Sequence, residues 1–361
     1  MSASNPLRAE ESRRPARRAG WRDPDLLRTA ALVLIAAAAG WYLMIQLAPV
    51  LRPLLTAAFL AYVLMPYHSR LRHRVGTPAS LVILAGSTAG TLVGLAFITY
   101  VSILELRDEV PTLQQRAGEL LTQAEHELAA RAPWVVPSGT AAQDRVNRQV
   151  TSFAGAVLGT SANAALEACV VALYLLFLLL EGSRFPDRVR KAYAPARAEQ
   201  ILQVAGEVNA AVISYLRAKV KSSLVLSVPV GLVLWALGVK FALLWMVLTF
   251  LCNFIPYIGS VVAYSLPVGF AFLMFGPAWQ PLAAAVLLLA CHLASASVVE
   301  PMLIGHAVGV SPLVILGSLA FWGLLWGIPG MFLAVPLTVV AILVMDHFDQ
   351  TRPVAQMLKG G

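Results

Sequence analysis

The most informative shortage in this sequence is electric charge. Charged residues make up 13% of its 361 residues, whereas soluble domains carry about 25%. From Ser222 to Met345 the only formal charges are Lys240 and Glu300. A domain that folds in water needs charged groups over its surface. This charge-poor stretch, more than a third of the chain, is therefore expected to fold in lipid.

Cysteine is scarce, and several catalytic motifs are missing. Cys169, Cys252 and Cys291 lie far apart in apolar segments without a CxxC pair, so we interpret them as small buried side chains. The sequence has no GxxxxGK[ST], HExxH or GxSxG motif, which argues against ATP hydrolysis, a zinc protease and a serine hydrolase. We expect no enzymatic activity, no cofactor and no metal site.

The formal net charge is +8, but the placement of the basic residues argues against a nucleic-acid partner. They gather in tails and short loops beside apolar runs, which is the pattern that orients membrane helices. Seven arginines lie between Met1 and Arg28, and a second basic stretch runs from His68 to Arg74. By the positive-inside rule both segments are cytoplasmic. The apolar runs at 29–48 and 53–66 therefore predict a membrane hairpin between them.

Two further segments carry polar residues together with a helical apolar face. Residues 105–160 hold seven acids and five arginines, and Val110, Leu113 and Leu120 recur there at helical spacing. We predict two amphipathic helices that pack on the membrane part or on a neighbouring subunit. Residues 181–221 hold eight basic and four acidic residues, which indicates a helix along the cytoplasmic membrane surface.

These patterns predict the order of the segments along the chain. It consists of a disordered basic cytoplasmic tail (1–28), transmembrane helices 1–3 (29–104), extracytoplasmic amphipathic helices (105–160), transmembrane helix 4 (161–181), a basic cytoplasmic interfacial segment (182–221), a transmembrane core with broken helices (222–345) and a cytoplasmic tail (346–361).

Two apolar units inside the charge-poor stretch, about 241–275 and 312–345, are interrupted in the same way. Each has about 15 apolar residues, then an Ile-Pro pair with a nearby glycine, then a second apolar run with an internal proline. Crossing a bilayer takes roughly 20 apolar residues, so each half is short. We predict an all-α polytopic membrane protein with about six full transmembrane helices and two broken or re-entrant hairpin units that form an inverted repeat. The alternative is two ordinary pairs of short, tilted spans.

An ordered series of motifs in the second half resembles the autoinducer-2 exporter family of bacterial permeases. The resemblance covers roughly residues 30–347. The motifs are Ser214-Tyr-Leu-Arg217, Leu237-Gly238-Val, Asn253-Phe-Ile-Pro256-Tyr-Ile-Gly259, Val299-Glu300-Pro301-Met-Leu-Ile-Gly305, Gly309-Val-Ser-Pro312-Leu-Val and Gly327-Ile-Pro-Gly330-Met-Phe-Leu-Ala-Val-Pro336-Leu.

The resemblance implies a multi-span transporter, associated in some relatives with signal-molecule export and in others with sodium/proton exchange. Some relatives are oligomeric. The sequence departs from the family pattern at three places: Ser260 stands where a proline is common, Ser311 where a histidine is frequent, and Glu181 where an aspartate is usual. The missing histidine argues against a proton role at position 311.

Glu300 is the first candidate site residue because it is the only carboxylate of the charge-poor stretch. An ionisable residue inside a membrane segment marks a solute or ion pathway. The structural alternative is a carboxylate that accepts hydrogen bonds from backbone N–H groups of the next loop. Asn253 precedes Pro256 by one helical turn, and its amide both donates and accepts hydrogen bonds. Together with Tyr257, these two residues form the predicted pathway.

Two other groups of residues complete the predicted site. Prolines and glycines are expected to break the helices and free backbone groups, and Pro301 is expected to end the helix that carries Glu300. The predicted break residues are Pro256, Gly259, Pro301, Gly305, Gly327, Pro329 and Gly330. Three basic residues are interpreted either as a cytoplasmic gate or as lipid-facing anchors. They are Arg217, Lys219 and Lys221.

These residues predict a permease of the bacterial inner membrane with both termini in the cytoplasm. It would export a small polar organic solute such as a signalling molecule, driven by a gradient or passively. The alternative is a monovalent cation/proton antiporter, and a third class is a non-transporting scaffold or regulator. A scaffold should tolerate neutral substitution at Glu300 and Asn253. The expected partners are the lipid bilayer, the solute or cation, and further copies in a homo-oligomer, with no nucleic acid.

Overall fold

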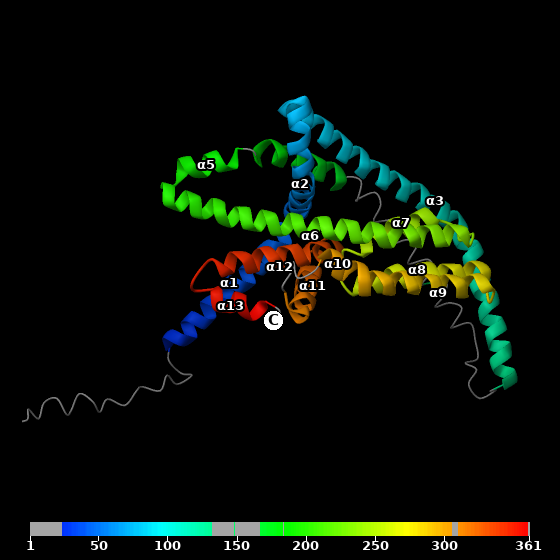
Figure 1. Ribbon diagram of the computed structural model, residues 1–361. Coiled ribbons are helices and arrows are strands. Elements are labelled where there is room, and N and C mark those ends of the chain that lie inside the picture. The colour runs from blue at the N-terminus through cyan, green and yellow to red at the C-terminus, as the bar shows by residue number, and fades with distance from the viewer. Residues whose placement is uncertain (1–23, 132–147, 149–166, 183, 305–309, 360–361) are drawn as a thin grey trace, which may run out of the picture. The chain divides into compact units, whose positions relative to one another are not determined.

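The computed structural model describes residues 24–131, 148, 167–182, 184–304 and 310–359. The chain divides into two units, Met1–Pro49 and Val50–Gly361. Within the described residues all regular secondary structure is helical (Figure 1). The one exception among these residues is an isolated β-bridge between Val310 and Lys359. The predicted all-α class is therefore confirmed.

Where the chain is described without a gap, successive helices are joined by short connections. They are α1 (Pro24–Gln46), α2 (Ala48–Val75), α3 (Thr77–Arg131), an unlabelled helix (Glu167–Gly182), α5 (Phe185–Ala192), α6 (Pro195–Ala236), α7 (Ala242–Cys252), α8 (Ile258–Phe275), α9 (Trp279–Ala294), the π-helix η3 (Ser295–Val299), α10 (Glu300–Ile304), α11 (Pro312–Trp326), α12 (Ile328–Asp346) and α13 (Arg352–Leu358).

Membrane-length helices dominate the described residues. Five are long and apolar enough to cross a bilayer, and the number rises to seven when each of two bent helix pairs is counted as one span. In the first unit α1 is a helix of 23 residues whose apolar side chains, such as Leu32 and Leu34, are exposed. Exposed leucines are normal where the surrounding solvent is lipid. The chain is a multi-pass membrane protein.

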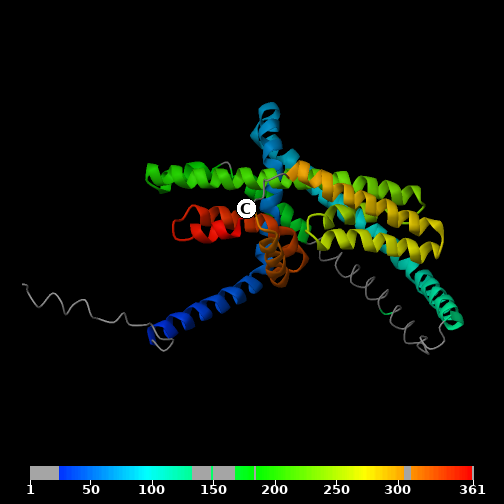
Figure 2. The same ribbon diagram turned by 60° about the horizontal axis from the view of Figure 1, so that its bottom comes forward.

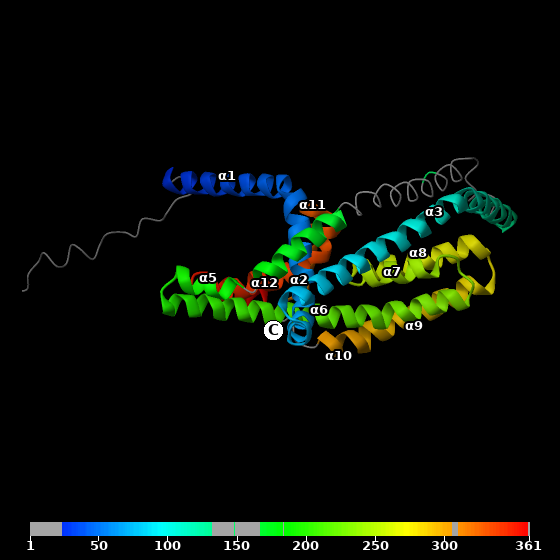
Figure 3. The same cartoon turned by 90° about the horizontal axis from the view of Figure 1, so that it is seen from above.

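The longest helix of the core, α6, organises the second unit. With 42 residues it is about 63 Å long, roughly twice the hydrocarbon thickness of a bilayer. One half of α6 packs beside α12, and the other half packs beside α7 and α9 (Figures 1, 2 and 3). Val212 and Tyr215 of α6 share a buried cluster with Leu333 of α12, whereas Val230 and Leu234 share another with Leu288 of α9. The middle of α6 therefore connects two packed groups of helices.

Two predicted segment boundaries fall inside continuous helices. The boundary at residue 104 lies within α3, which runs unbroken to Arg131 and places Leu106 and Leu113 in a buried cluster with residues of α6–α9. The boundary at residue 221 lies within α6. A change between polar and apolar composition does not by itself end a helix, because the backbone hydrogen bonds do not depend on side-chain polarity. Both helices also continue through an internal proline, Pro111 in α3 and Pro229 in α6. The second predicted amphipathic helix lies almost entirely outside the described residues.

Both interrupted units form helical hairpins. Residues 253–257 separate α7 from α8, and Gly327 alone separates α11 from α12 with φ of +67°. A Cβ atom on Gly259 would overlap the carbonyl oxygen of Cys252, and one on Gly330 would overlap the carbonyl oxygen of Trp322. The second helix of each hairpin thus needs a glycine where it touches the backbone of the first.

The expectation that Pro301 ends its helix is wrong. The π-helix η3 continues α9, and α10 carries Pro301 as its second residue. A proline inside an α-helix removes one hydrogen bond and its ring collides with the carbonyl four residues earlier. The preceding residues here form a π-turn, whose hydrogen bonds run to the fifth residue. The wider turn accommodates the proline, so the helix continues to Ile304.

Candidate functional site

Buried polar side chains gather at one place in the second unit. Of the eight buried polar or charged residues among those described, seven lie on α6, on η3, or on α7 and the residue after it. Polar groups inside a membrane protein are expensive and mark functional positions. The seven residues are Lys219, Ser222, Ser223, Ser227, Thr249, Asn253 and Ser295.

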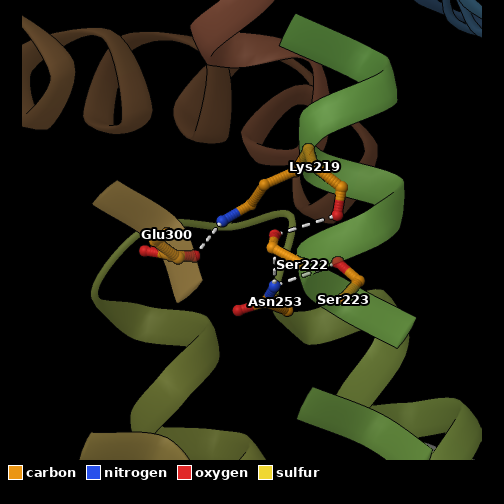
Figure 4. A network of polar contacts seen from close by, with 5 residues as sticks. All are labelled: Lys219, Ser222, Ser223, Asn253 and Glu300. Carbon is orange, nitrogen blue, oxygen red and sulfur yellow. Dashed lines mark hydrogen bonds and ion pairs between the residues drawn. The ribbon is translucent and has the colours of Figure 1, made fainter. Parts of the chain in front are cut away.

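An ion pair joins Lys219 of α6 to Glu300 of α10 (Figure 4). The Nζ of Lys219 donates a hydrogen bond of 2.6 Å to Oε1 of Glu300. The side chain of Lys219 is 6% exposed and that of Glu300 is 31% exposed. Each charge thus compensates the other at a depth where a single charge would be costly. The carboxylate keeps partial access to its surroundings.

Helical geometry explains why Lys219 faces inward. Successive residues of an α-helix turn by about 100°, so Lys219 lies about 200° from both Arg217 and Lys221. Arg217 and Lys221 are exposed, whereas Lys219 is buried. Lys219 follows the buried Tyr215 by four residues and so continues the apolar face of α6. The side chain of Lys219 therefore faces the protein interior and not lipid, unlike the side chains of Arg217 and Lys221.

The π-helix determines where Glu300 points. A π-turn adds one residue to a helical turn, which shifts every later side chain around the helix axis. Glu300 directly follows η3, so its orientation toward α6 depends on this extra residue. π-helices of a single turn occur frequently at functional sites.

Asn253 connects the α7–α8 break to α6. Its Nδ2 donates to the hydroxyl of Ser223 at 3.0 Å and lies 3.5 Å from that of Ser222 (Figure 4). The Ser222 hydroxyl in turn donates to the carbonyl oxygen of Lys219 at 3.1 Å. The amide group and the ion pair are therefore parts of one polar network along a single turn of α6. We call these five residues, Lys219, Ser222, Ser223, Asn253 and Glu300, the polar network.

Further polar atoms near the polar network have no hydrogen-bond partner among the described residues. They are the hydroxyl oxygens of Thr249 and Ser295, both of which belong to fully or nearly fully buried side chains. Thr249 lies four residues before Asn253, and Ser295 lies five residues before Glu300. Buried hydroxyl groups normally find a partner, so these two are exceptions beside the polar network.

The remaining predicted site residues have different positions. Tyr257 is 53% exposed and has φ of +62°, and its side chain takes no part in the polar network. Gly305 lies outside the described residues. Pro256 lies between α7 and α8, while Gly327, Pro329 and Gly330 lie at the α11–α12 break. Sequence reasoning missed Ser222 and Ser223, although their positions, three and four residues after Lys219, place them on the same helix face.

The polar network offers hydrogen-bond donors and acceptors rather than a set of metal ligands. Within the residues that the structure describes, no three His, Cys, Asp or Glu side chains come close enough to hold a metal ion. The single carboxylate is paired with a lysine. The polar network thus combines ammonium, carboxylate, amide and hydroxyl groups.

A multi-pass helical protein with a polar network beside a helix break in an apolar core has the architecture of a membrane transporter. Comparison with known proteins specifies the family. The family described as AI-2E family transporter matches residues 31–350, and the chain belongs to it.

Related proteins carry names that refer to transport. The chain is similar to YhhT of Escherichia coli (strain K12), which bears a transport-protein name, with 29% identity over 93% of this chain and 94% of that protein. It is equally similar, at 29% identity, to AI-2 transport protein TqsA of the same organism over 86% of this chain and 90% of TqsA. PerM, named as a permease, is 27% identical over 87% of this chain and 91% of its own length.

Proposed function

We propose that this transporter exports a small polar organic solute, driven by its gradient or by passive flow, and that the solute binds at the polar network. The observation that carries the proposal is the concentration of buried polar groups on one turn of α6, next to the α7–α8 break. In transporters, broken helices place unpaired polar groups where the substrate binds. The name of TqsA makes autoinducer-2 the first solute to test.

The proposed cycle depends on the Lys219–Glu300 ion pair. A solute with hydroxyl or carbonyl groups competes for the ammonium and the carboxylate, which are 2.6 Å apart when paired. Opening the pair lets α10 move relative to α6, and the break at Asn253 lets the α7–α8 hairpin adjust. We place both chain termini in the cytoplasm because of the basic tail and the basic segment before α6. The homo-oligomeric state stays a prediction.

Proteoliposomes that contain the purified protein test this proposal. Vesicles loaded with autoinducer-2 should release it faster than protein-free vesicles, and Glu300→Gln should slow the release at least about tenfold, equivalent to about 1.4 kcal/mol. Glu199→Gln is the matched control, because Glu199 is an exposed acid of α6 outside the polar network. Equal release from all three proteins would refute a role of the polar network, and no release by the wild type would refute this cargo.

A second candidate function is monovalent cation/proton exchange. It is favoured by one observation, namely that Glu300 is the only carboxylate of the charge-poor stretch and is partly accessible. The same vesicles, filled with a pH-sensitive dye, should then change internal pH when sodium, lithium or potassium is added outside. A pH change that disappears in Glu300→Gln supports exchange. A silent wild type in tight vesicles excludes it.

A further inference from the structure

A large cavity lies apart from the polar network. The cavity has a volume of about 1380 Å³ and lies among α2, the Glu167–Gly182 helix, α5, the first half of α6 and the end of α12. Pockets for small molecules usually measure 300–1,000 Å³, so this one accommodates a larger ligand. None of the five residues of the polar network lines it.

The walls of the cavity are mainly apolar. Along α6 they include Ile201, Val204 and Val208, and α12 contributes Val340 and Val344. Val208 and Val340 pack together in one cluster. A ligand that fills this space must bury a long apolar surface rather than many polar groups.

The cavity extends along α6 for the length of one lipid leaflet. Its lining residues on α6 run from Arg197 to Asn209, and these 12 helical steps span about 18 Å. Half of the hydrocarbon thickness of a bilayer is about 15 Å. The apolar wall of α6 therefore has the reach of a phospholipid acyl chain.

Positive charge lies at one end of this wall. Arg197, in the first turn of α6, lines the cavity, and its guanidinium donates to the neutral amide oxygen of Gln200 at 2.8 Å. From Glu181 to Glu199 the chain carries five basic and three acidic residues, and Glu181 is paired with Arg188. The chain around Arg197 thus keeps a net positive charge, which complements a phosphate group.

We propose that this cavity binds one anionic phospholipid, with its phosphate at Arg197 and an acyl chain along Ile201, Val204 and Val208. Apolar walls of leaflet length with a cationic group at one end match this class of ligand and no small hydrophilic solute. The proposal does not depend on the transported solute, because its readout is lipid binding.

Native mass spectrometry of the purified, delipidated full chain tests the proposal. The probes are phosphatidylglycerol and phosphatidylcholine with identical acyl chains. One phosphatidylglycerol should bind per chain, more tightly than phosphatidylcholine. A basic residue near a membrane surface contributes about 1 kcal/mol to attraction of anionic lipid, so Arg197→Gln should weaken phosphatidylglycerol binding about fivefold. Arg190→Gln is the charge-matched control, because Arg190 does not line the cavity, and it should change binding less than twofold.

Two variants fill the cavity from different helices, so that a folding defect in one leaves the other informative. Ala205→Trp on α6 and Ala61→Trp on α2 both replace lining residues and should abolish binding of the first phospholipid without lowering the melting temperature. Equal affinity for both lipids, or equal effects of Arg197→Gln and Arg190→Gln, would overturn the proposal. Tryptophan variants that lose transport but bind lipid like the wild type would show that the cavity is a solute vestibule instead.

Discussion

At the scale of single residues, the only carboxylate of the charge-poor stretch, Glu300, is paired with a lysine that lies outside that stretch, Lys219. Lys219 precedes Ser222 by three residues and Glu300 by 81, so no local pattern connects the two charges. The helical spacing from Tyr215 already indicates that Lys219 faces inward, but the identity of its partner depends on how α10 packs against α6. Side chains that are distant in sequence become predictable only once the packing is known.

The ion pair makes one thermodynamic prediction. Lys219→Met leaves the Glu300 carboxylate without its partner at a position that is 31% exposed, which should lower the free energy of unfolding by about 1–3 kcal/mol. The double variant Lys219→Met/Glu300→Gln removes both charges and should recover most of that loss. Thermal unfolding in detergent measures both values. Lys221→Met, at an exposed position two residues away, serves as control and should be neutral.

The amide of Asn253 makes a second prediction at this scale. Asn253→Ala and Ser223→Ala each break the buried 3.0 Å hydrogen bond and should each cost about 1–2 kcal/mol of stability. Because both act on the same bond, their effects should not add, and the double-mutant cycle should show a coupling of about 1 kcal/mol. A coupling of zero would mean that the bond contributes nothing to stability.

At the scale of helices, the close hairpins depend on glycines that allow backbone contact. Gly330→Ala places a Cβ atom against the carbonyl oxygen of Trp322, so it should separate α11 from α12 and lower the melting temperature by several degrees. Gly317→Ala is the matched control, since a Cβ atom there meets no atom within 4 Å and alanine favours a helix. A Gly330→Ala protein as stable as Gly317→Ala would show that the hairpin opens without cost.

The sequence predicted where the two hairpins break, but it did not predict where helices run on through an expected end. Pro256 and Gly327 lie between helices as expected because proline and glycine act on the local backbone. Pro301 does not break its helix, since a π-turn has no simple sequence signature and forms when packing favours an extra residue. The segment boundaries at 104 and 221 fall inside helices because composition changes there while the backbone does not.

At the scale of the whole second unit, polar contacts attach the second half of α3 to the core helices. Lys240, between α6 and α7, lies 2.9 Å from both carboxylate oxygens of Glu109, and Arg116 donates to the carbonyl oxygen of Met274 at the end of α8. These contacts hold one side of α3 against two helix connections at once. They make residues 106–117 part of the core rather than a separate polar domain.

Charge reversal should reveal this attachment. Lys240→Glu places two acids together and should accelerate hydrogen–deuterium exchange in residues 105–117, while Lys240→Glu/Glu109→Lys should restore the slow exchange. The change in overall stability should stay below about 1 kcal/mol because Lys240 is half exposed. Glu119→Lys, on the same helix, controls for a change of charge alone. Unchanged exchange in Lys240→Glu would mean that the apolar contacts of Leu106 and Leu113 suffice.

The Lys219–Glu300 pair also determines how the membrane voltage acts on the protein. A paired lysine and glutamate carry no net charge, so moving them together through the transmembrane field requires no electrical work. Moving one unpaired charge across the whole field changes the energy by about 2.3 kcal/mol per 100 mV. If a neutral solute opens the pair while both charges keep their depth in the membrane, its transport is independent of voltage. Glu300→Gln would leave the charge of Lys219 uncompensated, and any residual transport would then depend on membrane potential.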